Sequence, residues 1–188
     1  MNQKLERKFY LNEFRAISHA ISTYDDLNLL IQHLAEWTTK TFRSKGCSIM
    51  LYDERENQLF SVASYGISDG YLTKGPVFVN DSYSAFTKGV PVFVEDMQTD
   101  PRVQYPKEAE KEGIVSMLSL PIKFREYVIG LMRIYQDKKW EIHEEDIDSI
   151  SVLVTQLGLV IEYNGLKNFF EKVKISLESL PKRLMQGI

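Results

Sequence analysis

Two acidic residues and two arginines make up the side chains of this chain that could do chemistry together. Residues 90–103, VPVFVEDMQTDPRV, read as a strand that ends at Asp96 and is followed by Asp100-Pro101-Arg102. Arg133 falls inside an otherwise apolar strand, YVIGLMRIYQ. A cation in such a strand needs an anionic partner or an exposed end. We therefore expect Arg133 to pair with Asp96, or with a ligand carboxylate or phosphate, or else to reach solvent at the strand's edge.

Catalysis by these acids would need a nucleophile, a base or a metal beside them, and the sequence offers none. It has no G-x-S-x-G elbow and no phosphate loop, and Asp100-Pro101-Arg102 reads as a turn. Three histidines, His19, His33 and His143, lie without a partner at metal-ligand spacing. The single cysteine, Cys47, has small and apolar neighbours that favour a core position. We expect no metal, no cofactor and no enzymatic activity.

Composition limits the class of protein. The chain has 188 residues, 44% of them apolar, and a net charge of -3. This length suits one domain with an appended helix, and the missing basic face disfavours nucleic-acid binding. The N-terminal residues lack an apolar signal core, and no apolar run is long enough to span a membrane. We expect a soluble, cytoplasmic protein that does not bind membranes.

Hydrophobic periodicity predicts the elements that must position these side chains. Two helices come first, and two strand pairs and a long helix follow, with short helices and one strand between the pairs. This order predicts an α+β fold around a mostly antiparallel sheet of about five to six strands. The expected helices are 4–22, 25–45, 81–89, 107–114 and one from about 143, and the expected strands are 47–53, 59–66, 91–96, 115–124 and 127–136.

The last strand is apolar on both faces, so we expect it to be covered on both sides. Strict alternation divides it into two sets. Val128, Met132 and Ile134 form one, and Ile129, Leu131, Arg133 and Tyr135 form the other.

The long C-terminal helix carries two apolar stripes. The first, Ile147, Ile150, Val154, Leu157 and Ile161, is offset from the second, Leu166, Phe170, Val173, Leu177, Leu180 and Leu184. The offset indicates that the first half lies on the domain and the second half meets a partner helix. The alternative is a helix that folds back on its own domain. We divide the chain into an N-terminal dimer-forming helix (1–22), a domain (23–165) and a helical extension (166–188).

Four segments in this order resemble the GAF domain family. They are GCSIMLYDERENQLFSVASYG, SYSAFTKGVPVFVEDMQTDPRV, GIVSMLSLPIKFREYVIGLMRIYQ and WEIHEEDIDSISVLVTQLGLVIEY. The resemblance covers about residues 25 to 165 and departs at Ile142, where the family commonly has an aromatic. It implies a sheet with a ligand pocket on one face and, on the other, N- and C-terminal helices that form a dimer. Some members bind no ligand.

Several activities of the family do not fit this chain. Cys47 is misplaced for a bilin thioether link, and a lone cysteine leaves no resolving thiol for methionine sulfoxide reduction. The NKFDE-type motif of cyclic-nucleotide binders is absent. By the resemblance, a non-covalent pocket would be lined by Tyr65, Phe78, Tyr83, Phe86, Val94, Asp96, Met117, Ser119, Arg133 and Tyr135.

The sequence thus predicts a sensory or regulatory domain of a signalling protein. It would bind a small molecule without a covalent link and relay the change through a homodimer of N- and C-terminal helices to a downstream protein. The alternative is a dimerisation module without a ligand, in which the aromatic residues of the candidate pocket are ordinary core.

Overall fold

The computed structural model describes residues 7–79 and 84–178, which fold around one antiparallel sheet of six strands. The helices are α1 (Leu11–Thr23), α2 (Leu27–Phe42), α3 (Asp69–Leu72), α4 (Ala85–Lys88), α5 (Pro106–Glu112) and α6 (Glu144–Glu178). The strands are β1 (Gly46–Asp53), β2 (Gln58–Tyr65), β3 (Val77–Phe78), β4 (Val92–Val94), β5 (Ser116–Phe124) and β6 (Tyr127–Gln136). They lie in the order β3-β2-β1-β6-β5-β4.

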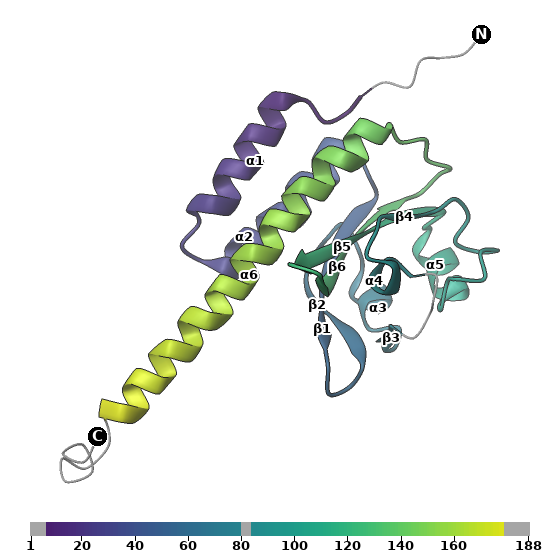
Figure 1. Ribbon diagram of the computed structural model, residues 1–188. Coiled ribbons are helices and arrows are strands. Elements are labelled where there is room, and N and C mark those ends of the chain that lie inside the picture. The colour runs from purple at the N-terminus through teal and green to yellow at the C-terminus, as the bar shows by residue number, and fades with distance from the viewer. Residues whose placement is uncertain (1–6, 80–83, 179–188) are drawn as a thin grey trace.

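Two layers cover this sheet (Figure 1). Helices α1, α2 and the first half of α6 pack on one face, and α3, α4, α5 and their loops lie over the other. The helix layer forms because apolar residues three and four apart share one face of a helix. In α6 these residues include Ile150, Val154 and Leu157, which are fully buried. The α+β architecture confirms the fold class predicted from the sequence.

The segment before α1 is extended rather than helical. The buried carboxylate of Asp146, in the first turn of α6, accepts hydrogen bonds from the backbone N–H groups of Lys8 and Phe9 at 2.8 and 3.0 Å. The Phe9 ring is buried in the helix-side core. The predicted helix from residue 4 is therefore wrong for residues 7–10, because Asp146 and the core hold these residues extended; residues 1–6 lie outside the described part.

A β-bulge in β6 changes the predicted grouping of its side chains. Ile122 pairs with Gly130 while Lys123 pairs with Val128, so Ile129 is the extra residue. The bulge reverses the alternation on its far side. As a result Ile129 packs into the helix-side core and Val128 into the core of the opposite face, the reverse of the prediction.

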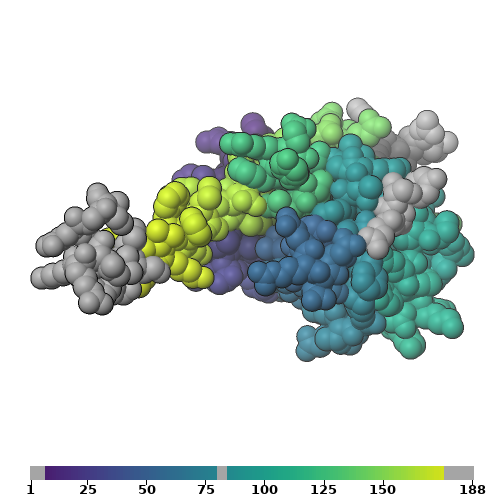
Figure 2. Space-filling model, turned by 60° about the horizontal axis from the view of Figure 1, so that its bottom comes forward, coloured from purple at the N-terminus to yellow at the C-terminus, as the bar shows by residue number. Residues whose placement is uncertain are grey.

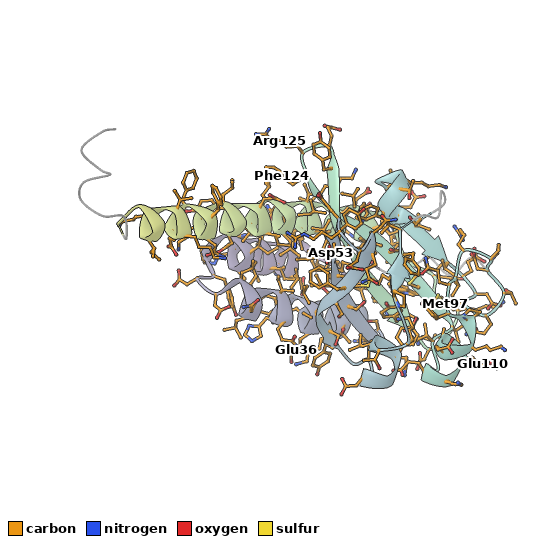
Figure 3. All side chains as sticks on the ribbon, turned by 90° about the horizontal axis from the view of Figure 1, so that it is seen from below. Glu36, Asp53, Met97, Glu110, Phe124 and Arg125 are labelled. Atoms are coloured by element: carbon orange, nitrogen blue, oxygen red, sulfur yellow. The ribbon has the colours of Figure 1, made fainter. Side chains whose placement is uncertain are left out.

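Helix α6 lies against β5 at Gly158. A Cβ atom on Gly158 would meet the Lys123 carbonyl oxygen at 1.9 Å, which is far too close for any side chain. The glycine therefore lets the helix and strand backbones approach each other directly. The β5–β6 turn beyond this contact projects from the sheet at Phe124 and Arg125 (Figure 3).

The second half of α6 leaves the domain. Figure 2 shows it projecting from the body of the molecule, and its apolar residues Leu166, Phe169, Phe170 and Val173 are exposed. Leu177, Leu180 and Leu184 of the second stripe lie outside the described side chains. By length and composition, Glu144–Ile175 also meets the criterion for a membrane-crossing helix, with a mean hydropathy of 1.2. Core helices of soluble proteins meet the same criterion, so this is weak support for a membrane span.

Candidate ligand-binding site

A cavity of about 40 Å³ lies between the sheet and the loops on the face opposite the helix layer. Its floor comes from β5 and β6, and its walls from β2, α3, β3, α4 and the loop that contains Met97. Figure 3 shows Met97 among these loops, at the other end of the molecule from the free end of α6. A cavity of this size holds a few water molecules or a group as large as a carboxylate.

Arg133 stands at the centre of a polar row on this face of the sheet. It pairs with Ser48 of β1 on one side and Ser119 of β5 on the other. Both serines are buried, and Arg133 lines the cavity. Arg133 Nε and Ser119 Oγ are buried without a hydrogen-bond partner in the described part of the chain. Buried donors without partners are rare in folded proteins, so these two need an explanation.

Tyr135 lies two residues along the same face. Its hydroxyl is 3.0 Å from Ser48 Oγ, and its ring meets the Tyr71 ring edge-on at 5.7 Å. Burial raises the pKa of Tyr135, while the charge of Arg133 and hydrogen bonds with Ser48 and Arg133 lower it. The phenol therefore stays neutral and can donate or accept one hydrogen bond.

Lys74 is the second cation at the cavity. Its Nζ donates to the Tyr71 carbonyl at 3.0 Å and lies 3.8 Å from the centre of the Tyr71 ring. Burial and then the charge of Arg133 lower the pKa of Lys74 to about 8, against weaker raising effects of Glu108 and Glu112. The charge of Arg133 thus acts on Lys74 more strongly than either acid of α5 does alone.

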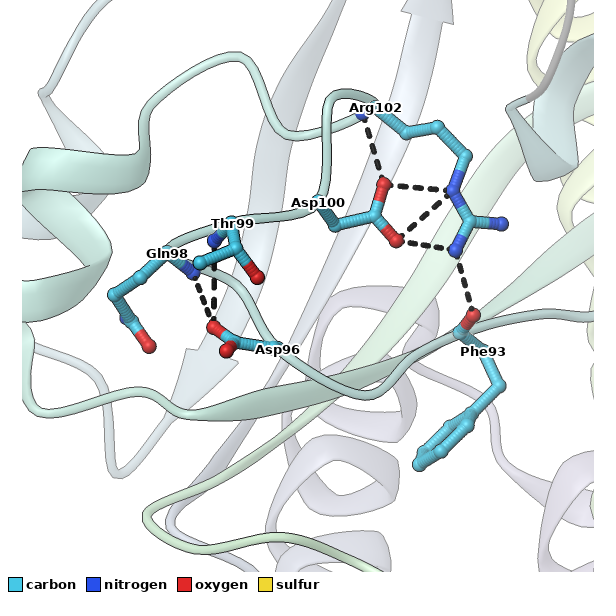
Figure 4. Close-up of polar contacts among 6 residues, drawn as sticks. All are labelled: Phe93, Asp96, Gln98, Thr99, Asp100 and Arg102. Atoms are coloured by element: carbon cyan, nitrogen blue, oxygen red, sulfur yellow. Dashed lines mark hydrogen bonds and ion pairs between the residues drawn. The ribbon is translucent and has the colours of Figure 1, made fainter.

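Asp96 is not paired with Arg133, which was one of the three alternatives that the sequence left open. Its Oδ1 accepts hydrogen bonds from the backbone N–H groups of Gln98 and Thr99 at 2.9 and 3.3 Å (Figure 4). These bonds, that of Gln98 first, lower the pKa of Asp96. The correction has a local cause: an Asp followed by a turn satisfies itself on the backbone N–H groups two and three residues ahead.

The Asp-Pro-Arg segment is a turn, as predicted. Arg102 Nε donates to both carboxylate oxygens of Asp100, at 2.8 and 3.1 Å, and Arg102 Nη2 donates to the Phe93 carbonyl at 3.2 Å (Figure 4). The hydrogen bond from Arg102 holds the pKa of Asp100 below its usual range. Arg102 also lines the cavity, but its charge is committed to Asp100.

The other predicted pocket residues divide into three groups. Phe78, Phe86 and Met117 line the cavity, and Val94 is buried in the core beside it. Tyr65 does not belong here, because it pairs with Cys47 on the helix-covered face and its ring lies 5.9 Å from Lys40 Nζ of α2. Tyr83 lies outside the described residues.

Sequence reasoning missed Tyr71, Lys74 and Tyr105, which also line the cavity. They come from the segment read as irregular and from the loop before α5, where no period reveals a buried side chain. The three-residue spacing of Tyr71 and Lys74 was the only local signal, since it places both on one side of a helical turn.

Neither a metal site nor a reactive thiol is found among the described residues of this site. No three His, Cys, Asp or Glu side chains gather as a metal site would require within residues 7–79 and 84–178. Cys47 is fully buried, and burial raises the pKa of its thiol, so the reactive thiolate is disfavoured.

Solved structures with the same fold come from signalling and enzyme proteins. A GAF domain of an Acinetobacter phosphoenolpyruvate-protein phosphotransferase is 20% identical with a TM-score of 0.70, covering 83% of this chain and 94% of its own. The corresponding Coxiella burnetii domain is 17% identical with a TM-score of 0.74, covering 84% and 95%. Free methionine-R-sulfoxide reductase of Neisseria meningitidis, solved with its substrate, is 16% identical with a TM-score of 0.67, covering 85% and 95%.

These likenesses establish the fold, because identity is at most 20% among the three. No curated protein matches the chain. A family model described as GAF domain matches residues 25–162, which is most of the chain. Together with the six-stranded sheet and its covering helices, this match shows that the chain belongs to the GAF domain family.

Proposed function

We propose that this GAF domain is a non-enzymatic, cytoplasmic sensory module that binds a small molecule non-covalently in the Arg133 cavity. GAF domains commonly serve sensing and signalling, and a domain of a two-component sensor histidine kinase protein from Sinorhizobium meliloti shares the fold with a TM-score of 0.63. The observation that carries the proposal is Arg133 Nε, buried at a cavity without a hydrogen-bond partner in the described chain. A bound molecule would satisfy this donor.

Methyl NMR of the methionines tests the proposal. Met97 and Met117 line the cavity, while Met132 is fully buried in the core of the opposite face. We expect a ligand from a panel of amino acids, nucleotides and 2-oxo acids to move the Met97 and Met117 signals with saturation and to leave Met132 unchanged. A panel that moves none of these signals, or all three equally, would contradict the proposal.

A second candidate function is dimerisation, with or without a ligand. The exposed apolar residues Leu166, Phe169, Phe170 and Val173 of α6 favour it, because such a stripe is typical of a helix that meets another helix. In this reading two copies pair through α6 and α1, and the pair transmits a signal to a downstream protein.

Light scattering of the full chain tests the dimer. We expect a dimer that becomes a monomer when Leu166 and Phe170 are both replaced by Glu, since two carboxylates would be buried at the helix pair. Lys167→Glu is the matched control, because Lys167 is exposed on another side of the same turn. A monomeric parent chain would remove this function.

A further inference from the structure

The charge of the cavity lining is unbalanced. Three cations, Lys74, Arg102 and Arg133, line it, and no Asp or Glu is among its described lining residues. Arg102 is neutralised by Asp100, which leaves Lys74 and Arg133. Burying charge without a counter-charge costs several kcal/mol per ion, and among the described lining residues no carboxylate offsets these two cations.

The geometry around Arg133 is that of a preformed site rather than of a surface cation. Arg133 lies mid-strand, and its neighbours across the sheet, Ser48 and Ser119, are 1% and 3% exposed. Arg133 Nε and Ser119 Oγ are buried and unpartnered in the described chain. A carboxylate or phosphate in the cavity could accept a hydrogen bond from Arg133 Nε. Ser119 lies beside Arg133 in the sheet but is not among the residues that line the cavity.

Lys74, which follows α3, adds a second charge to the cavity lining. Its position is fixed by the Tyr71 carbonyl and by the Tyr71 ring, which lies beneath its Nζ. An anion between the two cations would turn their repulsion into two attractions. The site therefore favours an anion more strongly than Arg133 alone would.

The space around the site limits the size of the ligand. The cavity itself, about 40 Å³, has room for an anionic headgroup only. Leu59, Lys74 and Val77 also line an open groove of about 650 Å³ that runs along β2 and includes Ser48 and Tyr135. A ligand could thus place its headgroup at Arg133 and its remaining atoms in the groove.

From this charge and geometry we infer that the ligand is a small organic anion whose carboxylate or phosphate headgroup lies between Arg133 and Lys74. The inference rests on the proposed sensory function, since it names the class of ligand for the same cavity. It assigns Arg133 the main contact and Lys74 the second charge.

The same Met97 and Met117 methyl signals test the inference with defined probes. Acetate, glutarate and inorganic phosphate are titrated into the full chain, with acetamide and glutaramide as neutral matches. We expect the anions to shift both signals and the amides to bind at least about tenfold more weakly, because each lacks the charge-assisted hydrogen bonds. Glutarate, acetate and phosphate also distinguish a carboxylate headgroup from a phosphate.

Variants locate the contacts. Arg133→Met should weaken anion binding at least about tenfold and Lys74→Met about threefold or more. Lys107→Met is the control, because Lys107 is an exposed cation on α5 that does not line the cavity, and it should leave affinity unchanged. If anions were attracted only by the general charge of the protein, which salt screens, all three variants would weaken binding equally.

The pH dependence of binding supplies a readout specific to Lys74. Acetate and glutarate keep their charge above pH 6, so the titrating group is on the protein. Affinity should be constant below about pH 8 and fall above it as Lys74 loses its proton, and Lys74→Met should abolish this fall. The charged and titratable groups around Lys74 are Tyr71, Tyr105, Glu108, Glu112 and Arg133.

The outcomes separate the two proposals. If the amides bind as tightly as the anions, or Arg133→Met binds anions normally, the anion inference is overturned while the ligand site stands. If no anion, amide or panel compound moves Met97 and Met117, both the inference and the sensory function are wrong.

Discussion

Replacing Arg133 by Met should stabilise the ligand-free protein. Arg133 Nε is buried at the cavity without a partner in the described chain, and the guanidinium repels Lys74. An unsatisfied buried donor costs about 1–3 kcal/mol, and a Met side chain keeps the apolar contacts of the arginine stem. The substitution also loses a hydrogen bond to Tyr135, whose hydroxyl keeps its contact with Ser48.

These effects leave a net gain of about 1 kcal/mol in the free energy of unfolding, equal to a rise in Tm of about 2–4 °C for a chain of this size. Urea denaturation in a buffer with chloride as the only anion measures it, provided that the m-value is unchanged. The gain would identify Arg133 as a residue kept for binding at a cost in stability.

Arg102→Met is the matched control, since it removes an arginine whose guanidinium donates to Asp100 and to the Phe93 carbonyl. It should lower stability by about 1 kcal/mol. If Arg133→Met also lowered stability by about 1 kcal/mol or more, Arg133 would have a structural partner. The reasoning that makes it a ligand contact would then fail.

Three further predictions concern stability. Asp146→Ala removes the acceptor of two backbone N–H groups ahead of α1 and should lower the free energy of unfolding by about 2–4 kcal/mol; urea denaturation should show almost no loss for Asp148→Ala, an exposed acid in the same helix. Gly158→Ala should unfold or strongly destabilise the chain, because the new Cβ atom would meet a β5 carbonyl. Gly165→Ala, where a Cβ atom would have no atom within 4 Å, should instead raise Tm through about 1 kcal/mol of helix propensity. Equal changes in Tm for the two variants would contradict the close approach of α6 to β5. Asp100→Asn should lower the free energy of unfolding by less than about 1 kcal/mol at pH 7. The hydrogen bond from Arg102 lowers the pKa of Asp100, so the stability that Asp100 contributes is present above the ordinary carboxyl pKa. In denaturation curves the difference between the variant and the parent chain should vanish below about pH 3.

Much of the fold could be predicted from the sequence because regular periods report which faces are buried. Strands β1, β5 and β6 and the start of α6 lie within a few residues of their predicted ranges. The bulge at Ile129 could not be predicted, since a local insertion in the pairing leaves no mark on the alternation of apolar residues. The extended segment at Phe9 could not be predicted either, because its partner, Asp146, lies 137 residues away.

The candidate site was harder to predict than the fold. Arg133 stood out because a cation interrupts an apolar strand, and that signal pointed to the cavity. Of the three alternatives for Arg133, the ion pair with Asp96 does not form, because short-range turn bonds compete with a long-range ion pair and need no chain closure. Lys74 was missed because a lysine in an irregular segment is ordinarily a solvated surface residue, and its three-residue spacing from Tyr71 was too weak a signal to outweigh that expectation.

Because Gly158 lets α6 contact β5 directly, α6 would act as a lever if the proposed ligand moved the sheet. β5 is the hairpin partner of β6, which carries Arg133, so the helix packs on the same strand pair that forms the cavity floor. From Gly158 to the end of the described helix at Glu178 the arm is about 30 Å long. A tilt of about 2° at that contact would move the far end by about 1 Å. A small adjustment of the sheet around a bound headgroup would therefore be amplified along the helix, at the end that lies farthest from the ligand.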